Sequence, residues 1–259
     1  MTAGAGKPGR HALLDVDGTL FPGVLGVHYL RDLARDGVCD VSAVEACLTV
    51  VERYATATAR REQLLAESYR LYSAAIQGAS HSQARKTAVK TWEACRDRLF
   101  PFAGELIDLL KRSGYLVHLI SGNAETLIRE AARDLGVSSG FGVRSEVVAG
   151  RFTGRLTGHP GLPGGKDAIV RALKETGGFD AESALAVGNT IRDAELFAHV
   201  GMAIAFEPDT ELRSLSSDRG WHVVDRETIV PVCARLFADL IPSPIWPRSE
   251  QDERALPRT

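Results

Sequence analysis

The sequence predicts an α/β protein whose parallel sheet core has helices on both faces and is interrupted by an all-helical insert. Apolar, strand-like runs alternate with helix-like segments between residues 101 and 240. Another apolar run, at residues 11–17, is separated from this alternation by residues 22–100, which show helical spacing and no convincing strand. Repeated strand–helix alternation favours a parallel sheet that is covered on both faces.

The first predicted strand, at residues 11–17, ends in two acidic residues. It follows residues 1–10, which are rich in glycine and are predicted to be a flexible tail. Asp15 and Asp17 are spaced i, i+2, so in an extended segment their side chains point the same way and share one small space. Two like charges repel there unless a cation or a proton is present. This pair is therefore expected to have a chemical role rather than a structural one.

The insert is predicted to be helical throughout. Apolar residues recur at helical spacing in residues 41–54, 60–76 and 83–99. Pro101 closes the insert, because proline resists continuation of a helix. The aromatic residues of this region are interpreted as packing within the insert, namely Tyr54, Tyr69 and Tyr72.

Helices and strands then alternate to residue 240. Helices are predicted at residues 103–112, 124–135, 166–176, 191–199 and 228–240. Strands are predicted at residues 115–120, 184–187, 202–206 and 221–224, with a hairpin over residues 144–156 around Gly150. Residues 241–259 contain four prolines and many charges, so they are predicted to form a flexible tail.

Polar residues follow several of these strands. Ser121 comes after the strand at 115–120, and Asn189 and Asp193 come after the strand at 184–187. In open α/β sheets, ligands bind beyond the carboxyl ends of the strands. These residues, the first acidic pair and Lys166 at the start of a helix are therefore expected to meet in one crevice.

Together, these four pieces of sequence resemble the haloacid dehalogenase superfamily and, within it, the phosphoserine-phosphatase-like branch. The first piece matches the family pattern Asp-x-Asp-Gly-Thr, and the resemblance covers residues 11–21 and about 100–230. It implies a Rossmann-like catalytic core over residues 11–21 and 101–240, with an all-helical cap domain over residues 22–100. It also implies a Mg²⁺-dependent phosphatase for a small phosphorylated metabolite.

The resemblance and elementary chemistry suggest a role for each residue. Asp15 is expected to attack phosphorus and form an aspartyl-phosphate, while Asp17 acts first as general acid and then as general base. Lys166 is expected to neutralise Asp15 and the transferred phosphoryl group. The phosphate is expected to contact Thr19, Ser121, Gly122 and Asn123. The Mg²⁺ ion is expected to be held by Asp15, Asp17, Asn189 and Asp193, the last directly or through a water.

Two positions depart from the family pattern. The family carries an aspartate where this chain has Asn189, which offers a metal a carbonyl oxygen but no charge. Phosphoserine phosphatases usually place a glutamate shortly after the first motif to hold the substrate amine, whereas residues 21–26 contain no acid. The leaving group is therefore expected to be less charged or more apolar than serine.

Two alternative functions stay open at this point. Asn189 favours a degenerate member of the family, which binds a phosphorylated ligand or a partner protein without turnover. Carbon–halogen hydrolysis also needs an aspartate nucleophile, but a halide leaves without a proton, so Asp17 argues against it. His118 lies in a buried strand pattern and is interpreted as a structural histidine rather than a base.

Composition limits the classes of partner and the cellular location that are expected. The chain has 31 basic and 33 acidic residues and a formal charge of −2, so no nucleic-acid partner is expected. No apolar run approaches the roughly 18 to 20 residues that span a bilayer, and no secretory signal is evident, so a cytoplasmic protein without a membrane partner is expected. The four cysteines show no metal-binding spacing and are expected to be reduced thiols: Cys39, Cys47, Cys95 and Cys233.

Overall fold

The computed structural model describes residues 9–57 and 59–238 of the chain. These residues form a seven-stranded sheet of order β4-β3-β2-β1-β5-β6-β7, in which β4 runs antiparallel to β3 and the other neighbours are parallel. The predicted α/β class is confirmed. Of the two predicted tails, residues 1–8 and 241–259 lie outside the described residues, and Arg10 belongs to the first strand.

The strands of this sheet vary in length from three to ten residues. They are β1 (Arg10–Leu14), β2 (Tyr115–Ala124), β3 (Ser139–Val148), β4 (Arg151–Gly158), β5 (Leu185–Gly188), β6 (Met202–Phe206) and β7 (His222–Val224).

Ten α-helices and two short 3₁₀ turns occur among the described residues. In the insert they are α1 (Leu25–Arg35), α2 (Val41–Thr56), α3 (Arg61–Ile76), α4 (His81–Cys95) and η1 (Arg96–Arg98). The others are α5 (Phe102–Arg112), α6 (Glu125–Asp134), α7 (Gly165–Glu175), η2 (Ile191–Asp193), α8 (Ala194–Phe197), α9 (Thr210–Arg219) and α10 (Ile229–Leu236).

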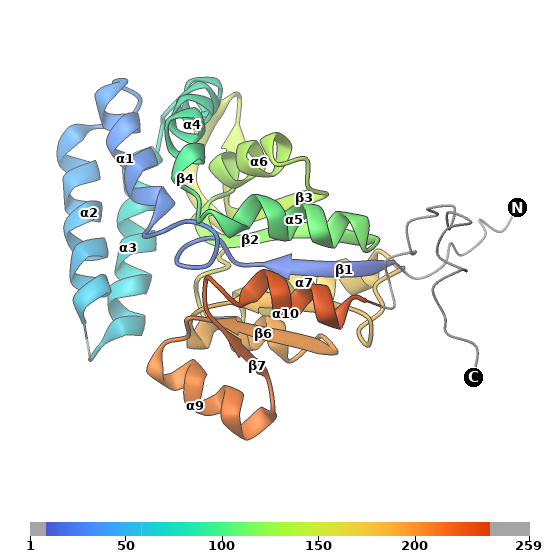
Figure 1. Cartoon of the computed structure of the whole chain (residues 1–259). Helices are drawn as coiled ribbons and strands as arrows, with labels where there is room; N and C mark the ends of the chain where they lie inside the picture. The colour runs from blue at the N-terminus through green and yellow to red at the C-terminus, as the bar shows by residue number, and fades with distance from the viewer. Residues whose placement is uncertain (1–8, 58, 239–259) are drawn as a thin grey trace, which may run out of the picture.

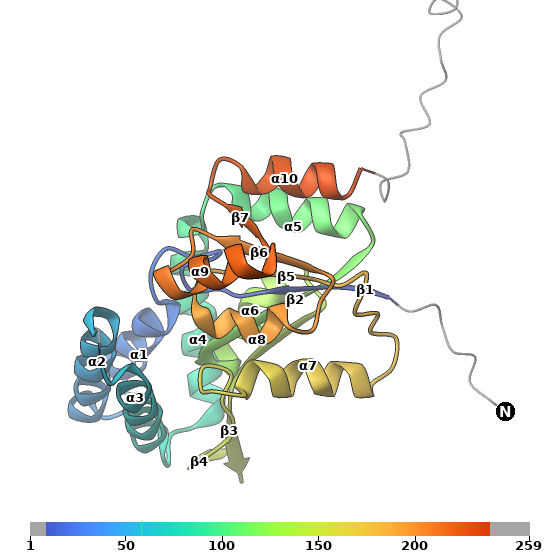
Figure 2. The same cartoon turned by 90° about the horizontal axis from the view of Figure 1, so that it is seen from below.

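Helices cover both faces of the sheet, with α5 and α10 on one side and α7 and α8 on the other (Figure 2). Strand β1 is buried on both faces, and its last three residues, Ala12 to Leu14, are accordingly apolar. Successive side chains point to opposite faces, so Leu14 packs with the α5 side of the core and Leu13 with the α7 side. Both side chains are fully buried.

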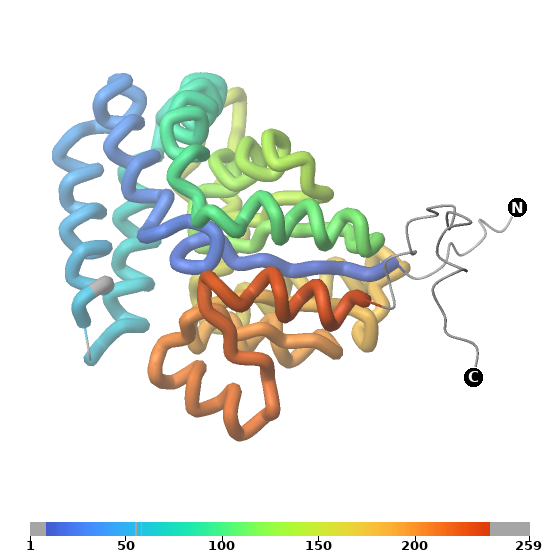
Figure 3. The backbone as a smooth tube through the Cα atoms, viewed as in Figure 1, coloured from blue at the N-terminus to red at the C-terminus, as the bar shows by residue number. Residues whose placement is uncertain are grey.

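The central strands end at one edge of the sheet. Leu14 lies opposite Leu119 of β2 and Val187 of β5 in parallel register. The segments that follow these strands therefore emerge together, beside helices α1 to α3 of the insert (Figures 1 and 3). This arrangement brings the predicted chemical residues to one place.

The insert is helical, as the spacing predicts. Helix α2 packs on α3, and α1 packs on α4, which also contacts α6 of the core. Side chains cap two of these helices, because Asp40 accepts a hydrogen bond from the Ala43 N–H and Ser80 accepts one from the Gln83 N–H. The assignment of residues 22–100 to a separate cap domain stays a prediction.

Four local predictions differ from the structure. The strand predicted at residues 115–120 continues as β2 to Ala124, so Ser121 lies on the strand rather than after it. Strand β1 ends at Leu14, so the acidic pair lies in the segment that follows the strand. Strand β3 begins at Ser139, before the predicted hairpin, in a stretch with two glycines. Glycine is needed there because a Cβ at Gly140 would lie 2.5 Å from the Ile128 carbonyl oxygen of α6. Helix α9 was not predicted because its sequence is mostly polar and lacks an apolar stripe.

The cysteines are free and buried, as expected of thiols that serve as small apolar residues. Among the described residues, no helix combines the length and the apolar character that crossing a membrane requires.

Candidate active site

The predicted site residues gather around a cavity of about 370 Å³ between the sheet edge and the insert. We call the polar residues at the sheet edge the floor of this cavity: Asp15, Asp17, Asn123, Lys166 and Asn189. We call the opposite side, contributed by α1 to α3, the cap wall: Val27, Leu30, Val51, Leu65, Tyr69 and Tyr72. Gly122 also lines the cavity, whereas three predicted residues lie fully buried behind the floor: Thr19, Ser121 and Asp193.

Lys166 lies between two carboxylates at the centre of the floor. Its Nζ is 2.7 Å from Asp15 Oδ1 and also contacts Asp193 Oδ1. Burial by itself lowers the pKa of Lys166, but the two carboxylates outweigh it and raise that pKa above its usual value. Lys166 is therefore a permanent cation beside the Asp15 carboxyl group.

Asp15 is held at both of its oxygens. Oδ1 receives Lys166, and Oδ2 accepts a hydrogen bond of 2.9 Å from the Thr19 hydroxyl. Burial raises the pKa of Asp15 to about 7, against the attraction of Lys166 and with a further contribution from the nearby Asp193 charge. The carboxyl group is thus oriented by protein contacts, and its negative charge is incompletely compensated.

Asp193 shapes the turn after β5 and orients the lysine. Its Oδ2 accepts the N–H groups of Asn189 and Thr190, both at 2.9 Å, while its Oδ1 contacts Lys166. A Cβ at Gly188 would lie 2.2 Å from the Asp193 Cγ, so this close approach requires glycine. Both Asp193 oxygens are therefore engaged inside the protein.

Asp17 connects the floor to the insert. Its Oδ1 accepts a hydrogen bond of 2.9 Å from the Leu25 N–H, and Asn123 Nδ2 donates to both of its oxygens at 3.0 Å. The Asn123 Oδ1 in turn accepts the Gly26 N–H at 2.9 Å. Burial raises the pKa of Asp17 to about 6, although these hydrogen bonds oppose the shift. Side chains of the core thus satisfy the N-terminus of α1, whose own N-cap residue, Val24, offers no side-chain hydrogen bond.

Ser121 faces inward in this structure. Its Oγ accepts a hydrogen bond of 3.2 Å from the Asn123 N–H at the end of β2. The next residue, Gly122, lines the cavity, and its carbonyl oxygen accepts the Tyr69 hydroxyl of α3 at 3.1 Å. Contact between Ser121 and phosphate stays a prediction.

The sequence analysis did not identify Glu195 of α8. Its carboxylate accepts the N–H groups of Gly164 at 2.7 Å, Lys166 at 3.1 Å and Asp167 at 3.2 Å. It therefore caps helix α7 from another element and places Lys166 on the first turn of that helix. No local pattern reveals this contact, because its partners are about thirty residues apart in the chain.

The donor set of the floor fits a hard cation such as Mg²⁺. The two carboxyl groups of the floor, the Asp193 carboxyl group behind it and one ammonium group meet there, so carboxyl groups outnumber cations. The Asp15 Oδ2 and the Asn189 Oδ1 converge on the Thr19 hydroxyl, at 2.9 and 3.3 Å. Within the described residues, no group of three or more His, Cys, Asp or Glu side chains is arranged for a metal, consistent with asparagine at position 189.

Known proteins are similar to this chain in sequence and in fold. The family model of the haloacid dehalogenase-like hydrolases matches residues 12–198. The chain is 30% identical over 215 residues to phosphoserine phosphatase SerB1 of Mycobacterium tuberculosis, a match that covers 83% of this chain and 70% of that protein.

Solved structures give the same picture. A protein of unknown function from Bordetella pertussis Tohama I is similar with a TM-score of 0.70 and 25% identity, covering 85% of this chain and 100% of that chain. A substrate-bound phosphoserine phosphatase shares the fold with a TM-score of 0.60 and 21% identity, covering 88% of this chain and 99% of that chain.

Proposed function

The chain belongs to the haloacid dehalogenase-like hydrolases, in the phosphoserine-phosphatase-like branch, and we propose that it is a Mg²⁺-dependent phosphomonoesterase that forms an aspartyl-phosphate. Its substrate is a small phosphorylated metabolite. The observation that carries the proposal is the position of Lys166 against Asp15, in one cavity with Asp17. A cytoplasmic location stays a prediction.

In the first step, a carboxylate oxygen of Asp15 attacks phosphorus and the bond between phosphorus and the ester oxygen breaks. Asp17 donates its proton to that leaving oxygen, so the product is a neutral alcohol. Lys166 stabilises the negative charge that gathers on the phosphoryl oxygens. The raised pKa of Asp17, at about 6, suits a group that must carry a proton near neutral pH.

In the second step, a water attacks phosphorus and the bond between phosphorus and the Asp15 oxygen breaks. Asp17 accepts the proton of that water, which restores its acid form, and inorganic phosphate leaves. Thr19 and Lys166 keep Asp15 in the same orientation through both steps. The insert excludes bulk water while the ester is cleaved.

Asp15, Asp17 and Asn189 would hold Mg²⁺, which when bound supplies the positive charge that lets an anionic ester approach a carboxylate. Asp193 is fully buried behind the floor and does not line the cavity, so of its two predicted roles the indirect one is favoured.

Phosphate release from a panel of phosphomonoesters, with Mg²⁺ and with a chelator, tests this proposal. We expect release by the wild type with Mg²⁺ only, and none by Asp15→Asn. Equal activity of the two proteins on every ester would contradict it.

Asn189 favours a second candidate, a protein that binds a phosphorylated ligand without turnover. An amide adds no charge to the metal site, so the site would bind Mg²⁺ more weakly. Turnover would then be lost because the metal is not held. Tight Mg²⁺-independent ligand binding without hydrolysis, together with phosphate release by Asn189→Asp, would support this candidate.

A further inference from the structure

We propose that the cap wall selects phosphomonoesters whose alcohol part is short, apolar and free of an ammonium group. This inference rests on the proposed phosphatase function and names the substrate class of the same site. It follows from the side chains of the wall, from the use of their polar atoms, and from the charges around the cavity.

Hydrocarbon surface dominates the side of the cavity that faces the leaving group. Each of the three helices of the wall contributes aliphatic or aromatic side chains. Val143 of β3 continues this surface on the core side. An alcohol released from a phosphate on the floor would therefore lie against carbon atoms.

Four of the polar groups in this part of the cavity are already occupied. Protein carbonyl groups accept the hydrogen atoms of three hydroxyl groups and one thiol group that line it. These contacts are Tyr29 to Ala84 at 3.1 Å, Tyr69 to Gly122 at 3.1 Å, Ser68 to Leu65 at 2.7 Å and Cys47 to Ser68 at 3.5 Å. The tyrosines Tyr29 and Tyr69 therefore offer a ligand their ring surfaces rather than their hydroxyl hydrogens.

The charges around the cavity disfavour a cationic leaving group. Arg61 and Arg192 both line it; the Arg61 guanidinium lies 4.7 Å from the centre of the Tyr54 ring, and Arg192 lies 2.8 Å from Glu62. Among the described residues that line the cavity, the acids are the two floor aspartates. A substrate ammonium would thus be desolvated without a free carboxylate of its own, which is costly.

The size of the cavity limits the alcohol. Small-molecule sites span about 300–1,000 Å³, and this cavity of about 370 Å³ must also hold the phosphate. A chain of a few carbon atoms or one ring fits this space.

A matched pair of substrates tests the inference on the full-length enzyme. Propyl phosphate and O-phosphoethanolamine differ by a methyl group in place of an ammonium group. We expect kcat/KM for propyl phosphate to be at least about tenfold higher, equivalent to about 1.4 kcal/mol. Equal values, or a preference for O-phosphoethanolamine, would overturn the inference and leave the phosphatase proposal intact.

A single substitution should reverse this preference. Val27 lines the cavity at the third position of α1, where glutamate suits a helix N-terminus. We expect Val27→Glu to shift the ratio of the two kcat/KM values at least about tenfold towards O-phosphoethanolamine. Ala43→Glu places the same charge at the third position of α2, away from the lining residues, and should leave the ratio unchanged. An equal ratio in the two variants would contradict the assignment.

Binding of non-hydrolysable analogues separates this inference from the proposed function. Calorimetry with wild-type protein should show tighter binding of propylphosphonate than of 2-aminoethylphosphonate. If no ester is hydrolysed but this order holds, the phosphatase proposal fails and the wall assignment stands. If the order is reversed, or if neither phosphonate binds, the wall assignment fails.

Discussion

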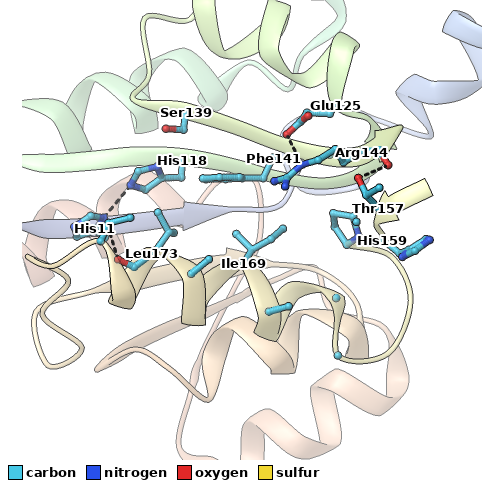
Figure 4. Close-up of a pocket in the computed structure, with 18 of the residues that line it drawn as sticks. His11, His118, Glu125, Ser139, Phe141, Arg144, Thr157, His159, Ile169 and Leu173 are labelled. Atoms are coloured by element: carbon cyan, nitrogen blue, oxygen red, sulfur yellow. Dashed lines mark hydrogen bonds and ion pairs between the residues drawn. The ribbon is translucent and has the colours of Figure 1, made fainter. Parts of the chain in front are cut away.

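Two buried polar clusters lie along the central strands of the sheet and differ in how they tolerate burial. At the carboxyl ends of the strands, Lys166 lies between Asp15 and Asp193 and compensates their negative charge. Further back, His11 and His118 face each other at one end of a groove of about 1220 Å³ between α7 and β2 to β4 (Figure 4). Their nitrogens lie 2.9 Å apart, and burial lowers both pKa values, that of His118 to about 4.

This comparison shows where the fold supplies opposite charges. A buried group either meets a partner charge or becomes neutral. The histidines are neutral, and within the described residues His118 Nδ1 has no hydrogen-bond partner. The floor and the adjoining Asp193 bring three carboxyl groups and a cation together, and the raised pKa values of Asp15 and Asp17 suit a reactive site. The following substitutions test this difference, from the largest expected effect to the smallest.

Asp15→Asn should remove the nucleophile and lower kcat by about 10³-fold or more, measured as phosphate release. The shape of the side chain is kept, so the protein should stay folded by circular dichroism. His11→Asn makes a comparable change in the histidine pair and should leave kcat within about twofold. Similar losses in the two variants would mean that the two clusters do not differ in function.

Lys166→Met should leave two buried carboxyl groups without their cation. We expect the free energy of unfolding to fall by about 3 kcal/mol or more, measured by urea denaturation at pH 8. His118→Leu removes one member of a neutral pair and should cost about 1–3 kcal/mol. If the histidine variant lost more stability than the lysine variant, charge compensation would not distinguish the clusters.

Acid should destabilise the protein through His118. The pKa of this histidine is lowered in the folded state, so the unfolded chain binds the proton more tightly. The contribution of neutral His118 to the free energy of unfolding is fully present above about pH 6.5 and is lost as the pH falls towards 4. The loss is about 2 kcal/mol at pH 5. Because the raised pKa values of Asp15 and Asp17 act in the opposite direction, the test compares the variant with the wild type: between pH 7 and pH 5, the unfolding free energy of His118→Gln should change by about 2 kcal/mol in its favour relative to the wild type.

The exposed residue His222 on β7 provides the control for this measurement. His222→Gln should keep the wild-type pH dependence. If His118→Gln showed the same dependence as the wild type, the acid sensitivity would have another origin.

Asn189→Asp should strengthen metal binding at the floor. A carboxylate in place of the amide adds one negative charge, so we expect the Mg²⁺ concentration for half-maximal phosphate release to fall about tenfold. Asp209→Asn removes one negative charge beside the same turn, where Asp209 accepts the Ile191 N–H, and should not lower the Mg²⁺ requirement. An unchanged Mg²⁺ requirement in Asn189→Asp would argue against Asn189 as a ligand.

Local sequence patterns predicted most of the fold because each element has its own signal. Buried strands such as β5 and β6 are short apolar runs, and the amphipathic helix α5 follows a proline. The first part of β3 was not predicted because glycine has a low strand propensity. Its glycines are needed instead for close contacts with α6 and β2. Helix α9 escaped because it buries few residues.

The candidate site, like the fold, could be predicted from the sequence only in part. Asp15 and Asn189 follow apolar strands, so parallel topology alone predicted that they meet. The hydrogen bond that Asn123 donates to Asp17, by contrast, joins residues that are 106 positions apart in the sequence. Tyr69 and Tyr72 of the cap wall were interpreted as packing within the insert, because spacing does not show that Tyr69 reaches Gly122 across the cavity.

The sequence by itself determined the sheet, the helical insert and the identity of the reactive groups at the strand ends, because these depend on periodicity and on chain neighbours. Only the tertiary structure decided which carboxylates share Lys166, that Glu195 caps the helix carrying it, and that the insert presents hydrocarbon to the floor. Those properties arise from contacts between distant segments, whose distances and desolvation are set when the core and the insert pack together.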